Sequence, residues 1–319
     1  MMTCQGRLQR RTPPDIFVCE AEASARARER LARFAVQAHT PNGASTGEGF
    51  RLARGEGIMA QAIDHVVIAV RDLARASTDY ETLGFTVTPG GEHVTGGTHN
   101  ALVSFADGAY FELIAFKEPD RPQEHKWWAK FQNGEGTVDF ALLATSLDVE
   151  GDRLSEAGLQ VAGPIDGGRQ RPDGQQLAWK TITLAADDVP LPFVIEDLTL
   201  RELRVPPGDA ARHPNGASGI AGLTLLVPDL DRASQAYAAL LETEGEAVPP
   251  PIEGVRRGRR FTFGSHWIEL AEPEGDAAEL HAQIRDRGAA PYEIVLGGVD
   301  ARAAPLPPEL THAARIRFA

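Results

Sequence analysis

The sequence predicts an α+β fold in which βαβββ modules pair to form cupped mixed sheets. Three observations carry this prediction: short β-branched runs alternate with helical segments, one such unit recurs 157 positions later without a gap, and a weaker copy lies between the two. A half-sheet of this kind leaves its concave face uncovered. We therefore expect the first module to pair with the second, and the third with the fourth.

The first unit begins at residues 63–70, a run of mainly Val and Ile that predicts a buried strand. A helical stretch follows as far as Leu83. Asp72 is a suitable N-cap because its carboxylate can accept backbone N–H groups, and Gly84 can adopt the left-handed conformation that ends a helix. Residues 110–114 predict an apolar strand at the end of the unit.

The first unit returns in the second half of the chain, which indicates an internal duplication. The segment 72–77 reads Asp-Leu-Ala-Arg-Ala-Ser, and its counterpart 229–234 reads Asp-Leu-Asp-Arg-Ala-Ser. Farther along, Tyr80 and Glu112 correspond to Tyr237 and Glu269, again 157 positions apart.

Two weaker copies complete the pattern. The second unit consists of strands and one helix, and the fourth is a shortened copy with a helix and a strand. The second unit comprises residues 138–143, 147–157, 158–161, 177–184 and 191–196, and the fourth comprises residues 277–287 and 292–296.

The modules define the expected domains of the chain. Residues 59–203 form one module pair and residues 219–319 a second, degenerate pair. The segment 204–218, rich in Pro and Gly, is the expected linker. Residues 1–58 have little hydrophobic periodicity and an excess of Arg, so we expect a disordered basic extension that need not be native.

Composition limits the kinds of molecule that the protein is expected to bind. The chain has 319 residues, 42% of them hydrophobic, and a net charge of −13, which argues against nucleic acid. No apolar run of about 18 residues and no secretory signal occur, so we expect a cytoplasmic protein without a membrane partner. Both cysteines, Cys4 and Cys19, lie in the basic extension, which leaves the body without a thiolate site. The expected partner is a small molecule, and a homodimer is left open.

Two polar residues stand inside apolar strands. His65 lies in the run of Val and Ile, and Glu112 lies between Phe111 and Leu113. A buried carboxylate is normally paired or bound to a metal, and a buried imidazole needs partners for its nitrogens. A hydrogen bond between His65 and Glu112, or an outward-facing Glu112, would also satisfy the pattern, so these interpretations stay open.

Several motifs carry a family resemblance. They are Ile63-Asp64-His65, Leu83-Gly84-Phe85-Thr86-Val87, Pro89-Gly90-Gly91-Glu92-His93, Gly97-Thr98-His99-Asn100-Ala101-Leu102, Tyr110-Phe111-Glu112-Leu113-Ile114, Arg171-Pro172-Asp173-Gly174 and Leu191-Pro192-Phe193. With these motifs, residues 62–200 resemble the vicinal oxygen chelate superfamily of glyoxalases and extradiol dioxygenases. Within it they are similar to the uncharacterised glyoxalase-like domain proteins.

The resemblance implies a divalent metal held inside the cup by the first and last strands of each module. Carried over, the ligands are His65 and Glu112 from the first module, and Asp139 and Glu196 from the second. One His with three carboxylates favours Mn, Mg or Fe(II), while Zn and Ni are also considered. If neither Asp139 nor Glu196 points inward, two ligands are too few, and the cup is a metal-free pocket.

His93 is the expected acid–base partner of Glu112. It flanks a Gly-rich loop at the mouth of the cup, where an imidazole can serve as acid or base, although histidines in such loops often have no role. In the second module pair, Gly222 stands where the first has His65 and cannot bind an ion. We expect that pair to be structural or to form a partner surface.

The expected function is a metal-dependent enzyme of lyase, isomerase or dioxygenase type acting on a small oxygenated molecule. The alternative is a non-catalytic protein that binds a small molecule in an aromatic-lined pocket. A third interpretation is an interaction scaffold. The aromatic residues available for the pocket are Phe105, Tyr110, Trp179 and Phe193.

Overall fold

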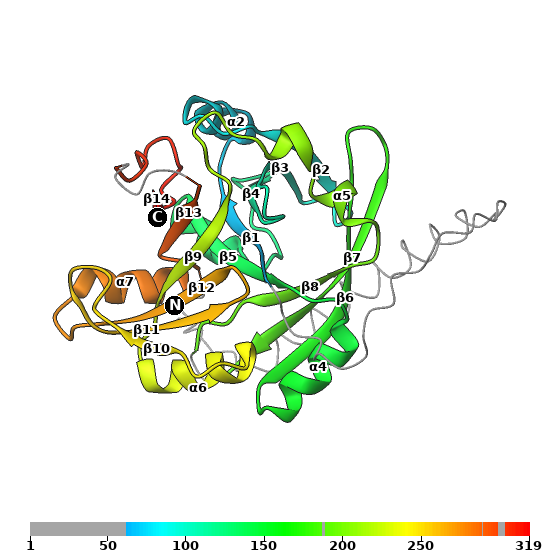
Figure 1. Ribbon diagram of the computed structural model, residues 1–319. Coiled ribbons are helices and arrows are strands. Elements are labelled where there is room, and N and C mark those ends of the chain that lie inside the picture. Colours follow the sequence, from blue (N-terminus) through cyan, green and yellow to red (C-terminus); the bar gives the residue numbers. More distant parts are fainter. Residues whose placement is uncertain (1–61, 187–188, 289, 299–303) are drawn as a thin grey trace, which may run out of the picture. The chain divides into compact units, whose positions relative to one another are not determined.

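The fold is described from a computed structural model that covers residues 62–186, 189–288, 290–298 and 304–319 (Figure 1). These residues belong to one compact unit, which comprises residues 56–319. The basic extension predicted at residues 1–58 lies outside the described residues. None of the helices in the described part combines the length and the apolar character needed to cross a membrane.

The first two modules follow the predicted order of strand, helix and three strands. Asp72 caps the first helix by accepting a hydrogen bond from the backbone N of Arg75 at 3.0 Å, and Gly84 ends that turn with φ +82°. The elements of the first module are β1 (Ala62–Ala69), α2 (Leu73–Thr82), β2 (Thr88–His93), β3 (Thr98–Ser104) and β4 (Tyr110–Phe116). After α3 (Trp128–Gln132), those of the second are β5 (Gly136–Leu143), α4 (Leu147–Glu156), β6 (Gln160–Gln170), β7 (Gln176–Ala185) and β8 (Phe193–Asp197).

These eight strands close on themselves in the order β1-β4-β3-β2-β6-β7-β8-β5. Within each module the first and last strands are parallel neighbours, β1 with β4 and β5 with β8. The modules meet at two antiparallel junctions, β1 with β5 and β2 with β6. The predicted pairing of modules one and two is therefore confirmed, and the closed sheet encloses an interior.

The second half forms an open six-stranded sheet in the order β10-β11-β12-β9-β13-β14. The strand β9 lies 157 residues after β1 at both ends, which confirms the duplication. The fourth module is short, as predicted, because in the described residues it adds to the sheet only β13, which pairs with β9, and β14, which pairs with β13. Along the chain, β8 is followed by α5 (Arg201–Arg204) and the 3-10 helix η1 (Gly208–Ala211), which lead to β9. The remaining elements are β9 (Gly219–Leu226), α6 (Leu230–Leu241), β10 (Glu246–Val248), β11 (Val255–Phe263), β12 (His266–Pro273), α7 (Ala278–Arg287), β13 (Glu293–Gly297) and β14 (Ile316–Phe318).

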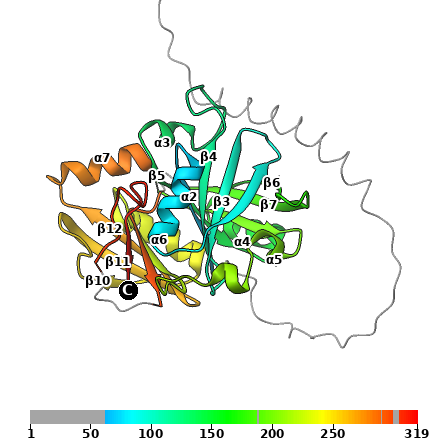
Figure 2. The same cartoon turned by 90° about the horizontal axis from the view of Figure 1, so that it is seen from above.

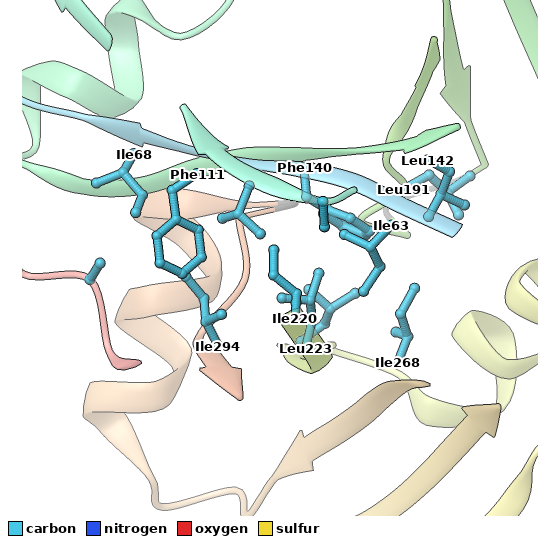
Figure 3. Close-up of a cluster of buried hydrophobic side chains, with 14 of the residues drawn as sticks. Ile63, Ile68, Phe111, Phe140, Leu142, Leu191, Ile220, Leu223, Ile268 and Ile294 are labelled. Carbon is cyan, nitrogen blue, oxygen red and sulfur yellow. The ribbon is translucent and has the colours of Figure 1, made fainter. Parts of the chain in front are cut away.

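One hydrophobic core joins the outer face of the closed sheet to the open sheet. Figure 3 shows Phe111 and Phe140 of the first sheet facing Ile220, Leu223 and Ile294 of the second. In Figure 2 the open sheet with α7 lies on the side opposite β2, β3, β6 and β7. Each large apolar side chain buried here contributes about 1.5–3 kcal/mol to folding. The core therefore fixes β1, β4 and β5, whose opposite faces line the interior.

Candidate functional site

Alternate residues on each central strand face the interior of the closed sheet. On β4, Phe111 and Leu113 belong to the core between the sheets, whereas Ile114 and Phe116 belong to a separate apolar cluster inside. Glu112 has the same parity as Ile114 and Phe116, so its carboxylate is directed inward. Successive side chains on a strand therefore point alternately into the core between the sheets and into the interior of the closed sheet.

Apolar side chains occupy one end of this interior. Trp127 and Phe131, from the segment before β5, pack with Ile114 and Phe116 at the carboxyl end of β4. At the other end, Val205 packs with Leu102 and Tyr110 near the start of β4. Glu112 lies between these two apolar groups and is only 5% exposed.

Three polar side chains surround the carboxylate of Glu112. The Nε2 atom of His65 is 3.6 Å from Oε2, and the Nε2 atom of His93 is 3.4 Å from Oε1. The Nδ2 amide of Asn100 donates a hydrogen bond of 2.7 Å to Oε1. Burial raises the pKa of Glu112, but the contacts with His93, His65 and Asn100 outweigh it and lower the pKa to about 2. The carboxylate is therefore ionised at neutral pH.

His65 is held by a network of buried charges on its other side. Its Nδ1 atom hydrogen-bonds the carboxylate of Asp64. Burial raises the pKa of Asp64, but Arg204, which donates two hydrogen bonds of 2.8 Å, and the contact with His65 hold that pKa well below its usual range. The ionised Asp64 accepts the Nδ1–H of His65 and so orients the ring with Nε2 directed toward Glu112.

The same network ties α5 to the closed sheet. Arg204 is 2% exposed and also bonds Asp197 and the hydroxyl of Tyr110, whose ring stacks on His65 at 4.6 Å. The Pro- and Gly-rich pattern of residues 204–218 predicts a linker and gives no indication of this role for Arg204. The only sequence signal was Asp64, an acidic residue inside an apolar strand that needed a cationic partner.

His93 joins the cluster as its position beside the Gly-rich loop suggested. Its Nδ1 atom hydrogen-bonds the hydroxyl of Thr98 at 2.8 Å, and its ring meets Trp179 edge-on at 6.1 Å. Thr98 therefore orients the imidazole so that Nε2 points to Glu112. The structure thus brings together His65, His93 and Glu112.

The two carboxylates expected from the second module, Asp139 and Glu196, have other hydrogen-bond partners. Asp139 Oδ2 accepts hydrogen bonds from Trp127 Nε1 at 2.7 Å and pairs with Lys126 at 3.1 Å. Glu196 accepts a hydrogen bond of 2.9 Å from the backbone N of Leu147, in the first turn of α4. The structure brings neither carboxylate to Glu112, so the four residues expected from the resemblance do not assemble around one point.

Register explains why Glu196 is absent from the cluster. Val67 pairs with Glu112 in the first module, and Ala141, its counterpart in the second, pairs with Phe193. The position equivalent to Glu112 is therefore Phe193, three residues before Glu196. An odd offset on a strand turns the side chain to the opposite face.

The donor chemistry of the cluster fits a divalent ion, although the ion's cage is not preformed. Among the residues that the structure describes, no set of three or more His, Cys, Asp or Glu side chains is placed as a metal-binding group. Two donors about 2.1 Å from one ion lie roughly 3.0–3.5 Å apart. The 3.6 and 3.4 Å separations of His65 and His93 from Glu112 are close to that range. The Asp64–His65 bond is the support that metal-binding imidazoles usually have.

A known protein family matches the part of the chain that carries the site. The profile of the glyoxalase-like domain family matches residues 63–241, more than half of the chain. A search of curated proteins found no match to the sequence.

One solved structure has a similar fold, and two others show a weaker likeness. A hypothetical protein from Staphylococcus aureus is similar with a TM-score of 0.58 and 14% identity, over 81% of this chain and 99% of that chain. A xylose isomerase-like TIM barrel/4-hydroxyphenylpyruvate dioxygenase fusion protein gives a TM-score of 0.49 and 18% identity, over 76% and 37%. A triple mutant of 4-hydroxymandelate synthase from Streptomyces coelicolor gives 0.48 and 13%, over 75% and 72%. At 14% identity the likeness to the Staphylococcus aureus protein concerns the fold alone.

Proposed function

We propose, from the premise that this chain belongs to the glyoxalase-like domain family of the vicinal oxygen chelate superfamily, that it is a metal-dependent enzyme acting on a small oxygenated molecule. The residues that would hold the divalent ion are His65, His93 and Glu112. When bound, such an ion polarises substrate oxygens and stabilises negative charge that develops on them. The reaction would be of the lyase, isomerase or dioxygenase type.

One observation carries the proposal. Glu112 is buried and ionised, yet the described part of the chain offers its carboxylate only two imidazole nitrogens, at 3.4 and 3.6 Å, and one amide. The 3.6 Å separation from His65 is too long for a hydrogen bond. Two imidazoles with one carboxylate form a donor set typical of Fe(II), and Mn, Zn, Ni and Mg also belong to the test.

The residues that contact the three proposed ligands hold them in position. Asp64 holds the Nδ1 proton of His65, and Thr98 orients His93. Asn100 fixes the rotamer of Glu112 through its amide. The apolar groups at both ends of the interior exclude water, which strengthens every electrostatic contact at Glu112. His93 thus serves as a third ligand here, instead of the acid–base role that the sequence suggested.

A second candidate function is non-catalytic binding of a small molecule. The observation that favours it lies in the second module, where Phe193 occupies the position equivalent to Glu112 and Asp139 is bonded to Trp127. The ammonium of Lys126 lies 3.8 Å from the centre of the Phe193 ring, so this side of the interior offers an aromatic surface and a cation.

Elemental analysis of the full chain, purified without chelator and incubated with each of the five ions, separates the two functions. We expect about one ion per chain, lost in the His65→Ala, Glu112→Gln double variant. The matched control is Glu269→Gln, which changes the corresponding residue of the second sheet and should retain the ion. Absence of an ion in every incubation, or equal content in the double variant, would contradict metal dependence and favour the binding protein.

A further inference from the structure

Arg169 is a buried cation beside the Glu112 cluster. It lies on β6 and is 3% exposed. In the junction between the modules Arg169 pairs directly with His93 of β2, and directly paired residues of two strands project from the same face of a sheet. The guanidinium is therefore directed into the same interior as His93.

Its hydrogen bonds leave one of the three guanidinium nitrogens without a partner among the described residues. Nη1 donates to Oδ1 of Asn100 at 3.1 Å, and Nη2 donates to the backbone oxygen of Arg204 at 3.0 Å. The buried Nε atom has no hydrogen-bond partner among the described residues. Arg169 also forms no ion pair with any carboxylate in the described ranges, so both bonded acceptors are neutral.

The buried Arg204 and the half-buried Arg153 show what a structural arginine requires. Arg204 bonds both Asp64 and Asp197, and Arg153 donates hydrogen bonds of 3.0 and 2.7 Å to Glu150. A buried charge without a paired counter-charge is costly, and burial accordingly lowers the pKa of Arg169. Such an energetic cost of burying a cation without an ion pair is expected at a binding site, where the ligand supplies the missing counter-charge.

The fold holds Arg169 in place for such a role. Asn100 bridges it to Glu112, because the Asn100 amide nitrogen donates to Glu112 while its oxygen accepts from Arg169. Gly90 leaves the room for this bridge, since a Cβ there would lie 2.0 Å from Asn100 Oδ1 and 2.6 Å from Arg169 Nη1. The cation is thus oriented next to the carboxylate that the proposed ion requires.

We propose that Arg169 is the anion-binding residue of this site and that it binds a carboxylate group of the substrate. The inference deepens the proposed function and rests on it for the identity of the site. Glu112 attracts the charge of Arg169 across Asn100 but does not pair with it. A substrate carboxylate would accept from the unpartnered Nε–H and pair with that charge directly, and charge-assisted bonds from arginine are the strong ones. The substrate class is then a small carboxylic acid that also carries the oxygens bound by the ion.

Thermal unfolding of the full chain in EDTA tests this inference without the metal. The probes are formate, acetate and benzoate, each beside its neutral amide at equal ionic strength, with inorganic phosphate as a separate arm. We expect at least one carboxylate to raise Tm while its amide does not. Arg169→Gln should lose that shift, and Arg169→Lys should retain it with binding weakened about tenfold or more.

The control is Arg171→Gln, which removes a guanidinium two residues along that is paired with Asp173; it should retain the shift. If Arg169→Gln does not fold, the Arg169→Lys and Arg171→Gln variants decide the matter. No shift with any carboxylate, a shift with phosphate alone, or an equal shift in Arg169→Gln would overturn the inference. Metal content of Arg169→Gln, which should equal that of the parent, shows separately whether the ion site has failed.

Discussion

The two copies of the duplicated module share a backbone but differ at the site. In the closed sheet, His65 pairs with Tyr110 and Glu112 follows two residues later; in the open sheet, Gly222 pairs with Trp267 and Glu269 follows. A Cβ at Gly222 would lie 2.1 Å from the Trp267 ring. The glycine therefore makes room for the tryptophan at the position where the first copy has a histidine.

The equivalent glutamates of the two copies, Glu112 and Glu269, differ in the charge of their partners. Glu269 receives two hydrogen bonds from Arg260, at 2.8 and 2.6 Å, whereas no arginine or lysine is paired with Glu112 in the described part of the chain. Arg260 thus neutralises Glu269, whereas the described contacts of Glu112 are two imidazoles and an amide. In the proposed function, this difference decides which of the two glutamates binds an ion.

The largest expected effect concerns the core that the two copies share. Phe111 is fully buried against both sheets, so Phe111→Ala should lower the free energy of unfolding by about 3–5 kcal/mol. Urea unfolding followed by fluorescence and circular dichroism measures this change. Because the core is common, we expect one transition. Two separate transitions, or a loss below about 1 kcal/mol, would show that the copies fold independently.

The charge of Glu112 should appear in the pH dependence of stability. Its pKa falls from 4.5 to about 2 on folding, so ionised Glu112 stabilises the fold fully above pH 4.5. That contribution, at most on the order of 3 kcal/mol, is lost as pH falls from 4.5 toward 2. Glu112→Gln should remove this part of the acid sensitivity in unfolding measured across the window. An NMR titration midpoint of Glu112 near 4.5 would contradict the assignment.

The packing of Trp267 on Gly222 predicts a smaller loss in the open sheet. Gly222→Ala places a methyl group against the ring and should cost about 1–3 kcal/mol, seen as a lower Tm. The Gly222→Ala, Trp267→Ala double variant should recover part of the loss that the alanine at 222 causes. An unchanged Tm in the single variant would remove the explanation offered for the missing histidine.

The smallest expected effect is an equal one in both copies. Asp72 accepts from the N of Arg75, and Asp229 accepts from the N of Asp231 and Arg232, all at 3.0 Å. Replacing either Asp with Ala should cost about 1 kcal/mol, since Asp72 caps α2 and Asp229 caps α6, the equivalent helix of the other copy. Thermal unfolding of the two single variants measures this. A difference above roughly 1 kcal/mol between them would mean that the copies are not equivalent even where their local contacts are.

The sequence predicted the parts of the fold that depend on local pattern. The bounds of β1 and α2, the cap at Asp72 and the repeat that places β9 all follow from periodicity and end signals within one segment. The approach of His65 to Glu112 was also within reach. It required only that the first and last strands of a module be neighbours, with both residues on the inner face.

The contributions that escaped prediction depend on distant contacts. Asp64 and Arg204 are 140 residues apart, and Asn100 and Arg169 are 69 apart. No local pattern specifies such pairs, because the closure of the sheet and the return of α5 bring them together. Glu196 shows the related difficulty that strand register decides which face a side chain occupies.

The most direct test of the proposed site is to locate the ion. Crystals of the full chain grown with manganese would give an anomalous difference map. The account predicts one peak about 2.0–2.3 Å from Nε2 of His65, Nε2 of His93 and the carboxylate of Glu112, with none at Glu269. A peak beside Glu269, or none near Glu112 in crystals that contain the ion elsewhere, would contradict it.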